Sequence, residues 1–114
     1  MIAHVVLFKP TPSLSADRQT AILEALNAAV TQSPSVRSCR VGRRVLHGLP
    51  GYEQAMLEDF QFLLVLEFDD IDGLREYLKH PTHTALGDFF SSAAAASLAY
   101  DYDVLELKSG APRT

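Results

Sequence analysis

The stretch FQFLLVLEF, residues 60–68, decides the fold because its centre is apolar on both faces of the strand that it predicts. Successive side chains of a strand point to opposite faces, so Leu63 and Leu64 cannot both face the same core. A second stretch, IAHVVLFK at residues 2–9, has the same two-sided apolar pattern. Two strands of the predicted sheet therefore have no face suited to water.

In the segments around these two strands, apolar residues recur at spacings of three and four positions. This pattern is typical of helices packed on a sheet. Pro81 divides the second helical region, because its fixed φ and missing N–H suit the first turn of a new helix. The other predicted elements are helices over residues 16–32, 71–78 and 82–96, a strand over residues 36–46, a loop over residues 47–58 and a last strand over residues 97–108.

The order of these elements is β-α-β-β-α-β, with the second helical region divided in two. This is the ferredoxin-like pattern of the α+β class, an antiparallel sheet with its helices on one face. Helices of this number can cover only one face of the sheet. The other face would then be a large exposed apolar surface, which is an aggregation hazard in a monomer. We therefore expect a homodimer in which two sheets pack face to face and form a dimeric α/β barrel.

The composition excludes several classes of protein. A chain of 114 residues with 47% hydrophobic and 21% charged residues is typical of one globular domain and not of a disordered chain. The net charge of −4 argues against a nucleic-acid-binding protein, which usually carries a basic stripe. We expect one domain over residues 1–108, followed by a flexible C-terminal tail over residues 109–114.

Two further features bear on the environment of the protein. Cys39 is the single cysteine, so no intrachain disulfide can form, and no apolar stretch approaches the length of a membrane span. We therefore expect a cytoplasmic protein that binds neither membrane nor nucleic acid. A group of arginines near the second strand is interpreted as solvated charge at the edge of the sheet, where it opposes pairing with other molecules. These arginines are Arg37, Arg40, Arg43 and Arg44.

Three features of the sequence are expected to meet at one end of the domain. They are His4 in the first strand, Tyr77 near the end of the short helix, and the run HPTH at residues 80–83. Histidine and tyrosine side chains close together can move protons or donate hydrogen bonds to a bound ligand. This group is therefore the candidate functional site.

Four segments, IAHVVLFK, FLLVLEF, YLKHPTH and YDYDV, together resemble the Dabb family, the stress-responsive dimeric α/β-barrel domain, over residues 2–107. The resemblance implies a dimeric barrel with a pocket in each subunit between the sheet and the helices. A plant member of that family, olivetolic acid cyclase, closes a linear polyketide with a histidine and a tyrosine that match His83 and Tyr77. A pocket histidine of its first strand matches His4. On this resemblance, His83 and Tyr77 are catalytic candidates and His4 is a substrate-binding candidate.

The chemistry of these side chains fits the implied roles without a metal or an organic cofactor. A neutral imidazole at His83 could take a proton from a carbon next to a carbonyl group. Tyr77 would stay protonated and donate a hydrogen bond to the carbonyl oxygen as charge develops there. Each residue also has a structural interpretation: His83 at a helix start, Tyr77 as a core aromatic residue, and His4 as a buried side chain that needs a partner.

A zinc site formed by His4, His80 and His83 is the weaker alternative. His80 and His83 lie on either side of the break at Pro81, and no Cys or Glu at ligand spacing supports them. His80 is expected instead to hold the turn before the proline. We therefore expect no metal site.

Three functions remain open at this point. The first is an acid–base catalyst, similar to a polyketide cyclase or a lyase, that acts on a hydrophobic carbonyl compound. The second is a non-catalytic module that binds a small hydrophobic ligand or takes part in a stress response. The third is a cofactor-free monooxygenase, which would consume oxygen with a quinol-like substrate.

Overall fold

The computed structural model describes residues 1–108, and the flexible tail predicted at residues 109–114 lies outside them. Within the described range the elements follow the order β-α-β-β-α-α-β. The strands are β1 (Ile2–Pro10), β2 (Ser38–Arg43), β3 (Phe62–Phe68) and β4 (Ala94–Asp103); the helices are α1 (Ala16–Gln32), α2 (Ile71–Lys79) and α3 (Pro81–Ala93), and one turn of 3-10 helix, η1, spans Glu53–Ala55.

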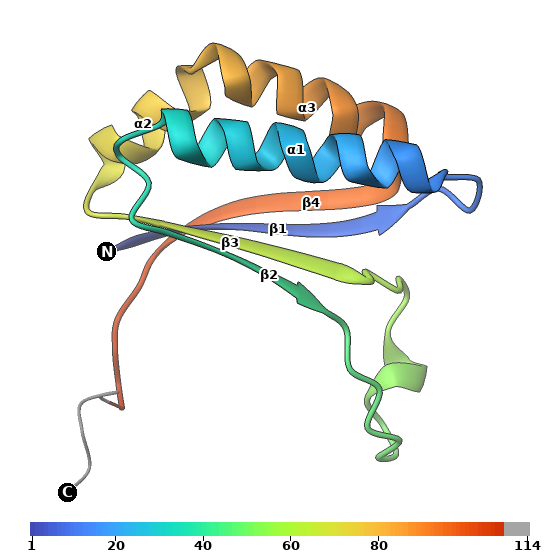
Figure 1. The fold of residues 1–114 in the computed structure, drawn as a ribbon. Coiled ribbons are helices and arrows are strands. Elements are labelled where there is room, and N and C mark those ends of the chain that lie inside the picture. Colours follow the sequence, from blue (N-terminus) through green and yellow to red (C-terminus); the bar gives the residue numbers. More distant parts are fainter. Residues whose placement is uncertain (109–114) are drawn as a thin grey trace, which may run out of the picture.

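The four strands form one antiparallel sheet in the order β2-β3-β1-β4, so the first strand lies at the centre between β3 and β4. The helices all lie on one face of this sheet, with α1 and α3 side by side across it (Figure 1). This is the ferredoxin-like α+β arrangement, so the predicted fold class is confirmed. None of the helices among residues 1–108 has the length and apolar character needed to cross a lipid bilayer.

The main core lies between the helices and the sheet, and every second side chain of a strand points into it. Leu66 and Phe68 of β3 point toward the helices and are fully buried, as is Ala29 of α1. Burying a Leu or Phe side chain contributes roughly 1.5–3 kcal/mol. Tyr77 of α2 belongs to the same cluster. This predicted site residue is therefore part of the main core.

The other face of the sheet has no helix over it (Figure 1). In the strand register, Val5 of β1 lies between Val65 of β3 and Tyr100 of β4. The apolar side chains of Leu63 and Leu98 on the same face are 37% and 40% exposed. The two-sided apolar pattern of the sequence thus corresponds to an apolar sheet face that nothing covers within residues 1–108. We call it the open face.

The boundary between α3 and β4 differs from the prediction. The alanines at residues 93–96 favour a helix by intrinsic propensity, and the predicted helix includes all of them. The helix instead ends at Ala93 and the strand begins at Ala94, because the first residues of β4 pair with the end of β1. The strand ends at Asp103, five residues earlier than predicted, since its partner there is Ile2, the first residue of β1.

The segment between β2 and β3 is a long loop. The second strand is shorter than the predicted range 36–46, and residues 44–61 connect it to β3 with one turn of 3-10 helix. The loop runs away from the sheet on the side opposite the helices (Figure 1). Its exposed apolar side chains are Val45, Leu46, Leu49, Tyr52, Met56 and Leu57.

Candidate functional site

The junction between α2 and α3 positions Tyr77 and His83. His80 ends α2 and caps α3, because its Nδ1 accepts a hydrogen bond from the Thr82 backbone N–H at 3.2 Å. Pro81 then occupies the first turn of α3. The chain changes direction at this junction, and the rings of Tyr77 and His83 meet with their centroids 4.9 Å apart. The expectation that His80 holds the turn is confirmed.

His4 approaches Tyr77 from the sheet. It lies on the helix-facing side of β1, is 7% exposed, and has its ring centroid 6.1 Å from that of Tyr77. Its Nδ1 lies 2.6 Å from Oδ1 of Asp101, the residue directly opposite on β4. A carboxylate only accepts hydrogen bonds, so Nδ1 of His4 carries the proton and its Nε2 is left for another partner. The three predicted residues, His4, Tyr77 and His83, therefore form one contiguous cluster.

Asp101 is the member of this cluster that the sequence interpretation missed. Residues 100–103 read YDYD, and this alternation places the two aspartates on one face of the strand and the two tyrosines on the other. An acidic residue on the core-facing side of the last strand is the signal that could have found it. Its pairing with His4 depends on the register between the first and last strands.

Burial changes the acid–base properties of Tyr77. The side chain is 1% exposed, and its ring packs on Phe68 with the centroids 5.5 Å apart. Desolvation by this burial, with a smaller contribution from the nearby Cys39 thiol, raises the pKa of Tyr77 from 10.0 to about 12. Tyr77 therefore keeps its proton at any physiological pH and can donate a hydrogen bond.

The pKa of His83 shifts in the direction that favours a neutral base. Burial, and then the proximity of His4, lower the pKa of His83 below its usual 6.5, while a hydrogen bond to the backbone of Leu78 acts in the opposite direction. The neutral imidazole therefore predominates at neutral pH. The cluster thus places a proton acceptor beside a group that keeps its proton.

The raised pKa of Tyr77 predicts a loss of stability in alkaline solution. An unfolded tyrosine ionises near pH 10 and the folded Tyr77 at about 12, so the unfolded state binds fewer protons between these values. The free energy of unfolding should therefore fall as the pH rises from 10 to 12. Urea unfolding of the wild type and of Tyr77→Phe at pH 8, 10 and 11 measures this. The decrease should be smaller in the variant, and parallel decreases in the two proteins would contradict the assignment.

A cavity of about 150 Å³ borders the cluster at α3. Residues of β1, α3 and β4 line it, and His83 is among them. A larger cavity of about 250 Å³ lies beneath α1, and Tyr77 and His4 line neither of the two. Of the predicted site residues, His83 is thus the one in contact with these cavities. The smaller cavity is lined by Val6, His83, Leu86, Gly87, Phe90, Ser97, Leu98 and Ala99.

The geometry gives no support to the zinc alternative. No group of three or more His, Cys, Asp and Glu side chains within residues 1–108 is arranged to hold a metal ion. Nδ1 of His80 also lies 2.6 Å from Oγ1 of Thr82, in addition to its contact with the backbone N–H of the same residue. One ring nitrogen of His80 therefore has a structural partner already.

Solved structures from several organisms share this fold. A hydroxynitrile lyase from Passiflora edulis has a TM-score of 0.79 at 13% identity, over 95% of this chain and 96% of that chain. A dimeric ferredoxin-like protein of unknown function from Thermobifida fusca has a TM-score of 0.70 at 23% identity, over 90% of each chain. A Dabb family protein with a ferredoxin-like fold from Mesorhizobium loti has a TM-score of 0.70 at 21% identity, over 92% of this chain and 97% of that chain. At these sequence identities, the structural similarity establishes the shared fold and nothing about function.

None of the curated proteins matches the chain. The family model described as the stress responsive A/B barrel domain, Dabb, matches residues 2–104. This range includes every element of the sheet and all three helices. The chain therefore belongs to the Dabb family of stress-responsive A/B barrel domains.

Proposed function

We propose that this protein is an acid–base catalyst that acts on a small carbonyl compound, with His83 as the base. The observation that carries the proposal is the position of His83, whose ring borders a cavity and also contacts the buried Tyr77. Its lowered pKa leaves the imidazole able to accept a proton at neutral pH. A mainly apolar cavity with a few polar groups is typical of a small-molecule site.

Two related reactions suit this arrangement. With a carbonyl compound, His83 takes a proton from the carbon next to the carbonyl group, and the electron pair moves onto the oxygen to give an enolate. The enolate carbon attacks a second carbonyl group, as in closure of a polyketide ring, and the alkoxide formed takes the proton back from His83. With a hydroxynitrile, as the fold shared with the Passiflora edulis lyase suggests, His83 takes the hydroxyl proton, the bond to cyanide breaks, and cyanide receives the proton.

The other members of the cluster have supporting roles in this proposal. Tyr77, which keeps its proton, donates a hydrogen bond to the oxygen on which charge develops. His4 binds a polar group of the substrate through Nε2, and Asp101 positions its ring. Neither Tyr77 nor His4 lines the cavity, so the substrate must reach past the ring of His83 to contact them.

We further propose that residues 1–108 form one domain that pairs with a second copy through the open face. The support is the row of apolar side chains around Val5, which no helix covers. The loop over residues 44–61 and the segment after β4 extend from the sheet on this same side (Figure 1), and both carry exposed apolar side chains. The protein of the same fold from Thermobifida fusca is dimeric.

The proposal is tested by measuring turnover of a panel of aromatic and polyketide-like carbonyl compounds and hydroxynitriles. We expect at least one compound to be converted, with a kcat/KM that rises with pH up to the pKa of His83 and is level above neutral pH. This direction follows because the neutral imidazole is the active form and its pKa lies below 6.5. Mass spectrometry identifies the products, and an oxygen electrode runs in parallel.

Two outcomes would count against this function. Saturable binding without any chemical change, unaffected by the protonation of His83, would favour the non-catalytic ligand-binding module. Oxygen consumption with a quinol-like substrate would favour the cofactor-free monooxygenase.

A further inference from the structure

The larger cavity lies between α1 and the side of the sheet formed by β2 and β3, and we call it the α1 groove. Its volume is about 250 Å³. Leu23 of α1 and Val41 of β2 line it and are 58% and 54% exposed, so the cavity opens to solvent. Gln19 and Arg43 are the polar side chains that line it, and the other lining side chains are apolar. The groove therefore combines an apolar surface with one positive charge.

Arg43 differs from the three other arginines of the cluster seen in the sequence. Arg37, Arg40 and Arg44 each have a guanidinium nitrogen within 3.0 Å of a carboxylate oxygen. Among residues 1–108, Arg43 has no carboxylate partner. Its guanidinium carbon lies 5.8 Å from the centroid of the Phe62 ring, and Phe62 also lines the groove. The unpaired charge therefore sits at the apolar groove.

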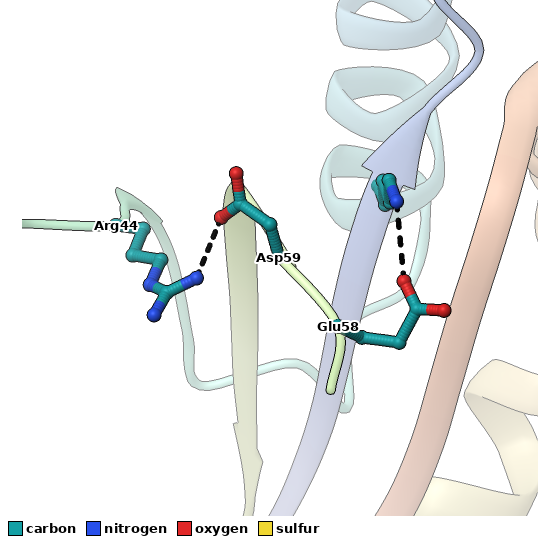
Figure 2. A network of polar contacts seen from close by, with 4 residues as sticks. Arg44, Glu58 and Asp59 are labelled. Atoms are coloured by element: carbon teal, nitrogen blue, oxygen red, sulfur yellow. Dashed lines mark hydrogen bonds and ion pairs between the residues drawn. The ribbon is translucent and has the colours of Figure 1, made fainter. Parts of the chain in front are cut away.

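The acidic residues at the end of the long loop do not neutralise Arg43, because each has its own cation. The Glu58 carboxylate lies 3.2 Å from Nζ of Lys9, and the Asp59 carboxylate lies 2.7 Å from Arg44 (Figure 2). Exposed ion pairs of this kind add little to stability. Neither carboxylate is paired with Arg43, whose charge has no carboxylate partner within the described residues.

We infer that the α1 groove binds an amphipathic carboxylate, with the apolar chain in the groove and the carboxylate on Arg43. A guanidinium group recognises a carboxylate through two parallel hydrogen bonds, and the Phe62 ring holds it in place. The volume of the groove corresponds to roughly eight groups of the size of a water molecule, at about 30 Å³ each. A carboxylate with a chain of about eight carbons therefore fits, and Gln19 offers a second polar contact.

The α1 groove and the cavity at His83 are neighbours, because Val6 and Phe90 line both. Binding at Arg43 needs neither the imidazole of His83 nor the phenol of Tyr77, so this inference is independent of the proposed catalysis. Octanoate binding that persists in His83→Ala would show this directly.

The test is isothermal titration calorimetry of the full chain with sodium octanoate and, separately, with octan-1-ol. Arg43→Gln keeps a polar side chain but removes the charge, so it should weaken octanoate binding at least about tenfold and leave octanol binding nearly unchanged. Arg43→Lys keeps the positive charge but lacks the planar guanidinium group that makes two parallel hydrogen bonds, so its octanoate affinity should be intermediate. The matched control is Arg40→Gln, on the same strand and the opposite face of the sheet, which should bind octanoate like the wild type.

Three results would overturn the inference. They are no octanoate binding to the wild type at millimolar concentration, unchanged octanoate affinity in Arg43→Gln, and equal weakening in Arg43→Gln and Arg40→Gln. The last would show general attraction of an anion to the arginines and not a site at Arg43. Because Arg43 is exposed, its replacement should leave the melting temperature unchanged, and thermal unfolding of each variant checks this.

Discussion

Replacing His83 with alanine is expected to lower kcat/KM at least about 100-fold on any compound that the protein converts, because positioned proton transfer contributes roughly 10²- to 10⁴-fold. The melting temperature should change little. His83 is only partly buried, and among residues 1–108 its side chain contacts the ring of Tyr77, the wall of the cavity and the backbone of Leu78. Activity and thermal unfolding are measured on the same preparation. The loss should lie in kcat, since the missing group acts in the reaction and not in binding.

His80→Ala is the matched control for this variant. His80 lies three residues earlier in the same motif, but its side chain caps α3. Loss of a helix cap costs about 1 kcal/mol, so this variant should melt earlier, while its kcat should fall far less than that of His83→Ala because the imidazole of His83 remains. Equal loss of activity and folding in His83→Ala, or full activity without the imidazole, would reject His83 as the base.

Replacing Val5 with aspartate is expected to dissociate the proposed dimer. Val5 lies at the centre of the open face, between Val65 and Tyr100 on the neighbouring strands. A carboxylate buried between two apolar sheets without a partner costs several kcal/mol, which would weaken the dimer by more than about 100-fold. Sedimentation velocity at micromolar concentration should show one chain in place of two.

Val5→Thr provides the control, because threonine is also β-branched and suits a strand but brings no charge. It should remain dimeric or dissociate only slightly. Circular dichroism checks that both variants keep their helices and sheet. A wild-type protein that sediments as one chain, or a Val5→Asp variant that remains a dimer, would show that the open face is not the interface.

The fold could be predicted because the patterns that indicate its strands and helices involve only residues close to each other in the sequence. The alternation in residues 60–68 and the spacing of three and four in residues 16–32 each depend on neighbouring residues. The helix has the predicted bounds, and the strand begins two residues later than predicted, at Phe62. The end of α3 could not be predicted in this way. Alanine has the highest helix propensity, yet Ala94 begins a strand because the end of β1 supplies its partner.

The candidate site was predictable only in part. The HPTH motif and the tyrosine before it lie close in the sequence, and the cap at His80 brings the rings of Tyr77 and His83 together. Asp101 was not found because its link to His4 depends on long-range strand register. Which residues line a cavity depends on side-chain packing, so the sequence could not distinguish His83 from Tyr77 in this respect.

The arginine cluster shows a similar limit. Four arginines within eight positions indicate solvated charge, and for three of them the ion pairs at the surface agree with that interpretation. Arg43 differs because of where its strand ends and because Phe62 lies beneath its guanidinium group. Neither fact is visible in the spacing of the arginines.

The hydrogen bond between His4 and Asp101 joins residues 97 positions apart, across the first and last strands. During synthesis on the ribosome, all three ring side chains of the cluster are therefore made before the carboxylate that holds His4. The strand β1 also lacks one of its two neighbouring strands until β4 has been synthesised. A prematurely terminated chain would thus lack both the carboxylate that holds His4 and the fourth strand of the sheet, so truncated products should be prone to degradation.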